Sequence, residues 1–424
     1  MKFLLPALAG AAAVLMAAGF PGPVTVAHAD PGAGSSDIAG GCSWSMELSP
    51  RTLGTLNFAY PDSGAAYWIL PYQVSPTLNI TVSGQFPDAR YMSFNTYDSR
   101  FSSFTAAGID SALPDDHITP AADAVNPWQQ AGAPGGNYSI SVRGDASPGQ
   151  PNVLPLAPAG TSSGIGYLIY RVYLPTGGPG AVSLPSVTLT DHGTSNTLRP
   201  CVGGVAGEAL GTVLGAADDL IALRSMLPSA PSAPTGFRRV TGAGAFPNVD
   251  NAYLADALDR PADGQVVLIH GKAPTVPAGP HPTPWPNASA DVRYFSLCVN
   301  MLDLPGPVVR NALPDNTVDV GCRNDTDTRI DSSGDYTYVV GTEQQRSAIE
   351  AVPGVTFVPW SLQGPNARHA ILLRNMLPDS NFGQAVQYVA PNSDPAVAAS
   401  VMGDYYPSTA TCTIEALQAG NCSA

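Results

Sequence analysis

The sequence contains very little lysine and few charged residues of any kind. Lysine occurs only at Lys2 and Lys272, and Asp, Glu, Lys and Arg together make up 12% of the chain. Acidic residues outnumber basic ones by 33 to 19, which gives a formal net charge of −14. Nucleic acid and anionic lipid surfaces are bound through clusters of positive charge, which this sequence lacks. The composition therefore predicts no nucleic-acid partner.

Motifs that hold metals or cofactors are also missing. None of the six cysteines forms a Cys-x-x-Cys pair, and no two histidines stand at zinc-ligand spacing, so no metal and no cofactor are predicted. Glutamate is scarce, and a glycosidase needs two carboxylates across a cleft. Aspartate can replace glutamate, so an exported hydrolase acting on glycans or esters stays open as an alternative function.

The N-terminus has the pattern of a cleaved signal peptide. Lys2 precedes an uncharged apolar run over 3–20, and Ala27-His28-Ala29 is a small-x-small cleavage motif. We predict removal of residues 1–29, with an uncleaved anchor as the alternative, and a flexible N-terminus over 30–41. No later segment is long and apolar enough to cross a membrane. The mature chain is therefore expected to be secreted or to remain in the cell envelope.

An even number of cysteines in an exported chain predicts disulfides. Six cysteines can pair in many ways, and their spacing gives only a preference. One pair would close a short C-terminal loop, one would join neighbouring strands, and one would clamp the two ends of the first half of the chain. The predicted pairs are, in that order, Cys412–Cys422, Cys298–Cys322 and Cys42–Cys201.

An internal repeat is the most informative feature of the sequence. The segment 89–94 (ARYMSF) matches 292–297 (VRYFSL), and 171–175 (RVYLP) matches 374–378 (RNMLP) at the same spacing. Upstream, Tyr60-Pro61 and Tyr67 align with Phe246-Pro247 and Tyr253 at a shorter spacing. A Pro-rich insert over 275–290 accounts for the difference.

The repeat predicts two related halves made mainly of β-strands. The segment 78–82 alternates apolar and polar residues, whereas 167–174 and 265–269 are continuous apolar runs that fit strands covered on both faces. The turn 331–334 suits a hairpin. We therefore expect a mainly β fold with short helices, in which two duplicated β-sandwich or jelly-roll halves pack together.

The expected boundaries follow from the repeat and from composition. The first β half covers 42–203, a helical connector rich in Ala and Leu covers 204–228, and the second β half covers 229–424. Helical segments at 384–389 and 396–402 are expected near the C-terminus of the second half.

Three candidate chemical motifs have ordinary alternatives that we favour. The segment 160–164 fits Gly-x-Ser-x-Gly, but it lacks the strand before it and the helix after it that a serine hydrolase requires. Asp115-Asp116-His117 and Asp191-His192 place acceptors beside an imidazole, yet adjacent strand residues face opposite ways. Calcium at Asp325 and Asp327 is a further alternative, against solvated turn residues, because the spacing does not fit an EF-hand.

Arginines occupy matching positions in the two halves. Arg90 and Arg293 begin predicted strands, whereas Arg171 and Arg374 lie within apolar ones. A buried guanidinium must be paired, because its desolvation is otherwise very costly. The duplication favours a structural role within each half's own fold, above all for Arg171 and Arg374. Anion or ligand binding is the second interpretation, for Arg90 and Arg293.

Tryptophans lie beside loops and prolines, where exposed rings can stack on sugars or contact acyl chains, although most tryptophans in small β domains are core residues. Trp285 lies in the Pro-rich insert and is predicted to be outside the core. Trp128 and Trp285 are therefore the aromatic candidates for ligand binding.

The segments 86–94 and 372–378, with 402–407 near the end, resemble a group of secreted actinobacterial proteins of unknown function. A more distant resemblance is to bacterial two-domain jelly-roll proteins without an established activity. The resemblance covers most of the chain, and it implies a fold class and an extracytoplasmic location without any catalytic assignment.

Export, low charge, β architecture and loop aromatics together favour an envelope-associated or secreted binding protein whose partner is an envelope glycan or glycolipid. An exported hydrolase is the first alternative, and a structural scaffold is the second. Titration with envelope glycans distinguishes binding without turnover from product release, and a scaffold would show neither.

Overall fold

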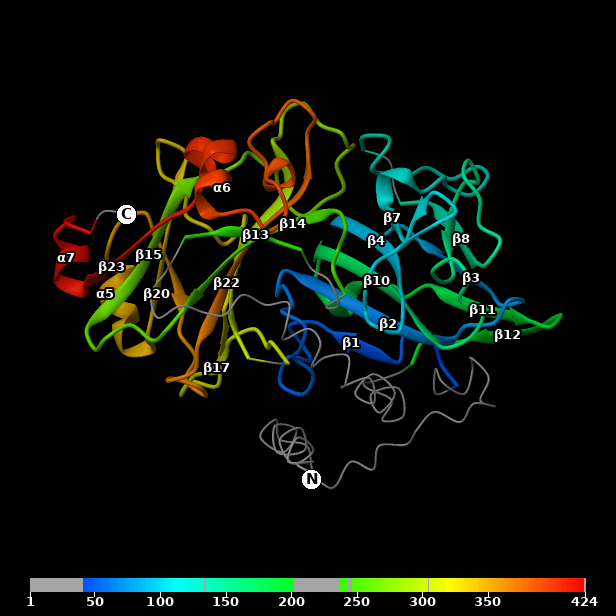
Figure 1. Cartoon of the computed structure of the whole chain (residues 1–424), viewed down its shortest axis with the longest axis horizontal. Helices are drawn as coiled ribbons and strands as arrows, with labels where there is room; N and C mark the ends of the chain where they lie inside the picture. Colours follow the sequence, from blue (N-terminus) through cyan, green and yellow to red (C-terminus); the bar gives the residue numbers. More distant parts are fainter. Residues whose placement is uncertain (1–40, 133–134, 202–235, 242–245, 304, 423–424) are drawn as a thin grey trace, which may run out of the picture.

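The computed structural model describes residues 41–132, 135–201, 236–241, 246–303 and 305–422. The predicted signal peptide, the connector over 204–228 and nearly all of the predicted flexible N-terminus lie outside these residues. The described chain is mainly β with a few short helices, as predicted (Figure 1). Within it, no helix is long and apolar enough to cross a membrane.

The first half contains two five-stranded sheets. The inner sheet, which faces the second half, has the order β1-β2-β10-β4-β7. The outer sheet has the order β12-β11-β3-β8-β9. The inner strands are β1 (Met46–Leu48), β2 (Ala65–Gln73), β10 (Ile165–Pro175), β4 (Ala89–Tyr97) and β7 (Ala112–Pro114). The outer strands are β12 (Thr194–Leu198), β11 (Ser186–Asp191), β3 (Asn79–Gln85), β8 (Asn137–Arg143) and β9 (Val153–Pro155).

The second half repeats this arrangement strand for strand, except that β12 has no counterpart in its outer sheet. The inner sheet has the order β13-β14-β22-β16-β19 and the outer sheet has the order β21-β20-β15-β23. The inner strands are β13 (Arg238–Val240), β14 (Asn251–Leu258), β22 (His369–Pro378), β16 (Val292–Met301) and β19 (Cys322–Asn324). The outer strands are β21 (Val355–Pro359), β20 (Asp335–Gly341), β15 (Gln265–Lys272) and β23 (Ser408–Thr413).

The repetition extends to local details of the backbone. Each outer sheet contains one parallel pair, β8 with β9 and β20 with β21, among otherwise antiparallel neighbours. Tyr60 and Phe246 both have a φ of 52°, and Leu174 and Leu377 have φ values of 46° and 43°. Residues other than glycine rarely adopt this left-handed conformation. Its recurrence at equivalent positions shows that both halves use the same backbone design.

Each half has its own core, and the two inner sheets also face each other. In β10, Leu168, Tyr170 and Val172 point into the core of the first half. The alternate residues Tyr167 and Ile169 belong to a cluster that includes residues of the second half. Strand residues alternate between faces, so a strand covered on both sides reads as a continuous apolar run, as predicted for this segment.

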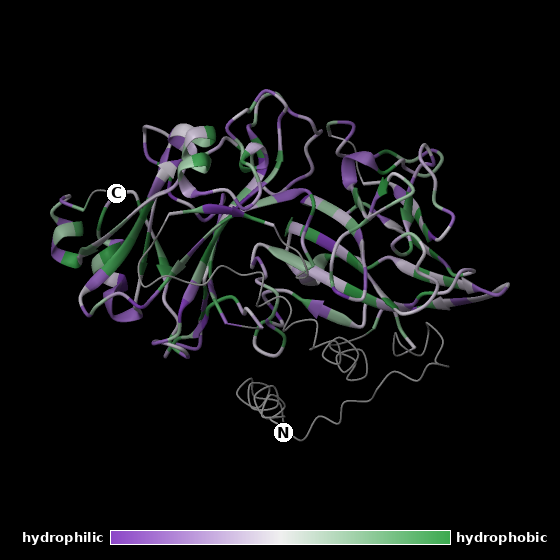
Figure 2. Ribbon diagram, viewed as in Figure 1, coloured by the Kyte–Doolittle hydropathy of each residue, from purple (hydrophilic) through white to green (hydrophobic). Residues whose placement is uncertain are grey.

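Short helices cover the outer sheet of the second half. Val266 and Leu268 of β15 pack on Ile349 of α5 (Arg346–Glu350) and Leu417 of α7 (Ile414–Gln418). This cover explains the second predicted apolar run, because β15 is also buried on both faces. Figure 2 shows hydrophobic residues along the strands of both halves and hydrophilic residues in many of the loops.

The remaining elements are short. Two small hairpins are formed by β5 (Thr105–Ala106) with β6 (Ile109–Asp110), and by β17 (Arg310–Ala312) with β18 (Val318–Val320). Near the C-terminus, η4 (Val386–Tyr388) and α6 (Pro395–Met402) lie in the segments predicted to be helical. The other single-turn helices are η1 (Asp115–His117), η2 (Pro179–Ala181), η3 (Glu343–Gln345) and η5 (Gly403–Tyr405).

The three disulfides are those that the spacing favoured. Cys42 is bonded to Cys201 across a sequence separation of 159 residues. A single parallel β-bridge between Ser43 and Pro200 brings these two ends together. The other two disulfides are Cys298–Cys322, between the paired strands β16 and β19, and Cys412–Cys422 at the C-terminal loop.

Candidate functional site

Two buried ion pairs cross between the halves at equivalent positions. Arg90 of β4 donates to both carboxylate oxygens of Asp325 in the second half, at 3.3 and 3.2 Å. Arg293 of β16 places its Nη1 atom 2.7 Å from Oδ1 of Asp115 in the first half. All four side chains are at most 2% exposed. Each arginine therefore neutralises a carboxylate of the opposite half.

The predicted role of these arginines within their own halves is wrong. Arg90 Nη1 also donates to the carbonyl of Arg293, and Arg293 Nε donates to the carbonyl of Arg90, so the exchange is reciprocal. A duplicated unit that packs on its own copy about an approximate two-fold axis makes every contact twice, in opposite directions. The repeated arginines are therefore interface residues.

The second duplicated pair also crosses the interface. Arg171 Nη2 donates to the carbonyl of Phe246 at 2.6 Å, and Arg374 Nη2 donates to the carbonyl of Tyr60 at 2.7 Å. Tyr60 and Phe246 are the equivalent residues with left-handed backbones, and each offers its carbonyl to the opposite half. Arg171 and Arg374, for which a structural role within each half was favoured, therefore also join the two halves.

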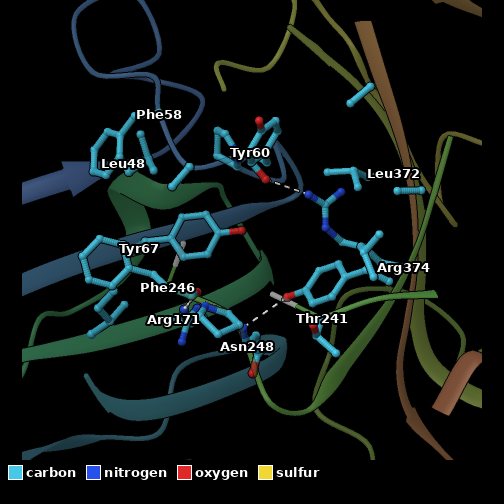
Figure 3. Close-up of a pocket in the computed structure, with 18 of the residues that line it drawn as sticks. Leu48, Phe58, Tyr60, Tyr67, Arg171, Thr241, Phe246, Asn248, Leu372 and Arg374 are labelled. Atoms are coloured by element: carbon cyan, nitrogen blue, oxygen red, sulfur yellow. Dashed lines mark hydrogen bonds between the residues drawn. The ribbon is translucent and has the colours of Figure 1, made fainter. Parts of the chain in front are cut away.

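An apolar pocket of about 140 Å³ lies between the halves beside this second pair. Figure 3 shows Arg374 reaching towards Tyr60, with Arg171 below the ring of Tyr67. Both arginines line the pocket, as do the exposed residues Thr241 and Asn392. Its apolar wall includes Leu48, Phe58 and Ile69 from the first half, and Phe246, Leu302 and Leu372 from the second.

The tryptophans do not form an exposed surface, which corrects the prediction for Trp285. This side chain is only 9% exposed, and Trp128 is fully buried. The Pro-rich insert folds against the first half, because the Trp285 amide donates to the Trp128 carbonyl and the Gly279 carbonyl accepts from Arg90. The guanidinium of Arg293 lies 5.7 and 6.0 Å from these two indole rings. Both tryptophans thus enclose a buried cation.

The predicted calcium alternative is not supported by the positions of its aspartates. Asp325 pairs with Arg90, while Asp327 Oδ2 accepts from Asn324. Asp331 and Asp335 form a hairpin turn, as predicted, in which the Asp331 amide donates to the Asp335 carbonyl. Among the described residues, the one grouping of metal-ligand atoms joins Asp62 to Cys298 and Cys322, whose sulfurs are already bonded to each other.

The other motifs are ordinary surface features. Residues 160–164, which fit the serine hydrolase pattern, form an exposed loop before β10 with no helix after it. His117 is 71% exposed while its neighbour Asp115 is buried, and His192 is 78% exposed. No acid–base site therefore forms at these histidines in the described structure. His369 is instead buried against Trp360, and burial lowers its pKa to about 4.

Burial opposes the ionisation of both carboxylates in the crossed pairs. It raises the pKa of Asp115 from 3.8 to about 7 and that of Asp325 to about 6, although the facing arginines act in the opposite direction. Asp115 therefore tends to take up a proton when the chain folds, because the unfolded chain exposes this carboxyl to water.

We expect Asp115 to make the protein less stable as the pH rises from about 4 to about 7. The folded state binds more protons than the unfolded state in this window, so the free energy of unfolding falls by up to about 1.4 kcal/mol per pH unit from this group. The free energy of unfolding of the wild type minus that of Asp115→Asn, measured by denaturant unfolding, should therefore fall with rising pH. A difference that grows with pH contradicts this sign. Asp263→Asn, at a 96% exposed side chain, is the control.

The roles of Asp62, Asp115 and Asp325 as partners of the duplicated arginines were not predicted from the sequence. Asp115 follows β7 and Asp325 follows β19, so they are equivalent by position in the two inner sheets. Asp115 Oδ2 accepts from the Met92 amide, and Asp325 Oδ2 accepts from the equivalent Phe295 amide. Extending the repeat to these short strands would have shown acids recurring with the arginines.

No family model matches the chain, and no curated protein matches it. Among solved structures, the chain is similar to an uncharacterized protein from Burkholderia cenocepacia, with a TM-score of 0.51 and 12% sequence identity, over 90% of this chain and 85% of that one. A protein from Vibrio parahaemolyticus has a TM-score of 0.38 and 13% identity, over 84% of this chain and 90% of that one. The first likeness concerns the fold alone.

Proposed function

We propose that this chain is an exported binding protein that holds the apolar part of an envelope lipid or glycolipid in the pocket between its halves. The observation that carries the proposal is the pocket itself, because apolar side chains of both halves line it while two guanidinium groups lie at its wall. Binding sites for small molecules typically combine an apolar wall with a few polar groups that fix orientation.

Two further observations support the lipid part over the sugar part of such a ligand. All five tryptophans are at most 9% exposed, so none of them offers an open ring for stacking on a sugar. The pocket wall is instead suited to an acyl chain, because most of its lining is apolar and apolar cavities accept apolar guests.

Export is part of the same proposal. Three disulfides are typical of chains that fold in an oxidising compartment outside the cytoplasm. The apolar N-terminal run with its cleavage motif supports the same location. An envelope lipid is available to a protein in that compartment.

The test is lipid capture by a pocket-filling variant. Ala255 lines the pocket and is 8% exposed, so Ala255→Trp should fill the cavity. We expect the wild type, incubated with an extract of bacterial envelope lipids and re-isolated, to retain lipid detectable by native mass spectrometry. Ala255→Trp should retain at least about tenfold less, and Ala312→Trp, at an exposed position outside the pocket, should behave as wild type.

The same preparation is then incubated with envelope glycans and with esters. Retained lipid without any released product supports the binding function. Released product overturns it in favour of a hydrolase, and failure to retain any lipid overturns it in favour of a scaffold. Equal lipid retention by the wild type and by a folded Ala255→Trp variant shows that the lipid lies elsewhere.

A further inference from the structure

In the described structure, one of the four duplicated arginines lacks the carboxylate partner that the other three have, although the two halves are otherwise alike here. Three of them have a carboxylate of the opposite half within 4.0 Å, whereas Arg171 has none in the described part of the chain. The three pairs are Arg90–Asp325 at 3.2 Å, Arg293–Asp115 at 2.7 Å and Arg374–Asp62 at 3.8 Å. Arg171 is nevertheless only 1% exposed.

The missing carboxylate corresponds to a single residue. Asp62 follows Tyr60-Pro61, and the residue that follows Phe246-Pro247 at the same place is Asn248. The two side chains also have the same local role, because Asp62 Oδ1 accepts from the Gly64 amide and Asn248 Oδ1 accepts from the Asp250 amide. The second half therefore has a neutral amide at this position, and Asp250, two residues later, accepts from the Tyr91 hydroxyl as Asp62 accepts from the equivalent Tyr294 hydroxyl.

All of the hydrogen-bond partners of Arg171 are neutral. Its Nη1 donates to Asn95 Oδ1 at 2.5 Å and its Nη2 donates to the Phe246 carbonyl, while Nε has no hydrogen-bond partner among the residues that the structure describes. The rings of Tyr67 and Tyr97 lie 5.6 and 5.3 Å from the guanidinium carbon and stabilise the cation only partly. A buried cation with an unpaired N–H group is costly unless an anion completes it.

The acidic residues around the pocket have other partners. Asp256 lines the pocket, and its carboxylate accepts hydrogen bonds from the Gly236 and Ala257 amides. Asp250 accepts from the Tyr91 hydroxyl at 2.5 Å. Asp250 and Arg171 attract each other electrostatically, but no carboxylate of the described residues lies within 4.0 Å of the Arg171 guanidinium, so Arg171 has no direct ion pair there.

We propose that the ligand of the pocket carries a carboxylate that binds Arg171, and so supplies the charge that Asn248 does not. This inference rests on the proposed binding function and names the ligand class: an apolar chain that ends in an acid. Guanidinium–carboxylate hydrogen bonds are charge-assisted and are stronger than bonds between neutral groups. The apolar wall would contact the chain while Arg171 binds its acidic end.

Calorimetric titration of the purified protein with octanoate, octanol and octyl phosphate tests the ligand class. We expect octanoate to bind about tenfold or more tightly than octanol, because octanol has the same chain and no charge. Equal affinity for octanoate and octanol overturns the acid assignment and leaves the binding function standing. Tighter binding of octyl phosphate than octanoate overturns the choice of carboxylate, and binding of none of the three counts against the proposed function.

Asn248→Asp is the sharpest variant, because it restores the carboxylate that the symmetry predicts and changes the side chain very little. We expect it to weaken octanoate binding by roughly tenfold to a hundredfold and to leave octanol binding unchanged, since the new charge pairs with Arg171. Asn316→Asp adds the same charge at an exposed turn and should bind octanoate as the wild type does.

Arg171→Met provides a second, independent variant. It should lose octanoate binding to the same degree and keep octanol binding, provided that its unfolding transition shows a folded protein. Octanoate affinity that is unchanged in both Asn248→Asp and Arg171→Met rules out Arg171 as the acid-binding group.

Discussion

Replacing Arg90 by methionine should lower the free energy of unfolding by about 3–5 kcal/mol. The variant leaves Asp325 buried without its cation, and breaking a buried pair from one side is far more costly than losing an exposed pair. Denaturant unfolding at about pH 8 is the measurement, because in the wild type burial raises the pKa of Asp325 to about 6, so that the carboxyl is ionised and paired with Arg90 at pH 8.

The double variant Arg90→Met with Asp325→Leu should recover most of this loss. Two apolar side chains of similar volume remove both charges together, and such replacements are often neutral or stabilising. Arg260→Met is the matched control, because Arg260 and Asp263 are 39% and 96% exposed and such pairs contribute about 0–1 kcal/mol. If the double variant is as unstable as the sum of its single variants, the two residues do not act as a pair.

The arginines also show how far the sequence alone could lead. Their positions at strand starts and within apolar runs favoured a structural role, in which a buried guanidinium must be paired. All four arginine side chains are at most 4% exposed. Their partners were beyond reach, because a guanidinium can be satisfied within its own half or across an interface. The packing of one inner sheet on the other decides which of these two kinds of partner an arginine has. That packing depends on all the residues of the sheet face and cannot be read from a local pattern.

The strands and disulfides were more accessible for a physical reason. Strand patterning is local, since side chains alternate every second residue, and the continuous run at 167–174 could be recognised without knowing what covers it. The disulfides match the pairing that sequence spacing favoured among several possible ones. The pocket has no such local signal, because Leu48 and Leu372 are brought to the same wall only by the fold.

The prediction for Trp285 was wrong, although the local observation behind it was correct. Its surroundings are rich in proline, and such segments usually lie on the surface. This insert instead covers the first half, where its backbone binds Trp128 and Arg90. An insertion present in one half only has no partner in the repeat, so the repeat could not indicate where it packs.

Removing the disulfide between Cys42 and Cys201 should produce an equally large loss, of about 5 kcal/mol. A cross-link lowers the conformational entropy of the unfolded chain, and this effect grows with the logarithm of the number of residues in the loop that it closes. The Cys42–Cys201 disulfide has a sequence separation of 159 residues. The comparison is the Cys412–Cys422 disulfide, with a separation of 10 residues, for which the same relation gives about 3 kcal/mol. Each pair is replaced by two alanines, so that no free thiol remains, and unfolding is followed in denaturant.

The long-range disulfide joins the two ends of the first half, whose inner sheet forms one wall of the pocket, so its loss should also weaken lipid retention in the capture experiment. A larger destabilisation from the short loop than from the long one would mean that native packing around the cysteines, rather than restriction of the unfolded chain, determines what these bonds contribute.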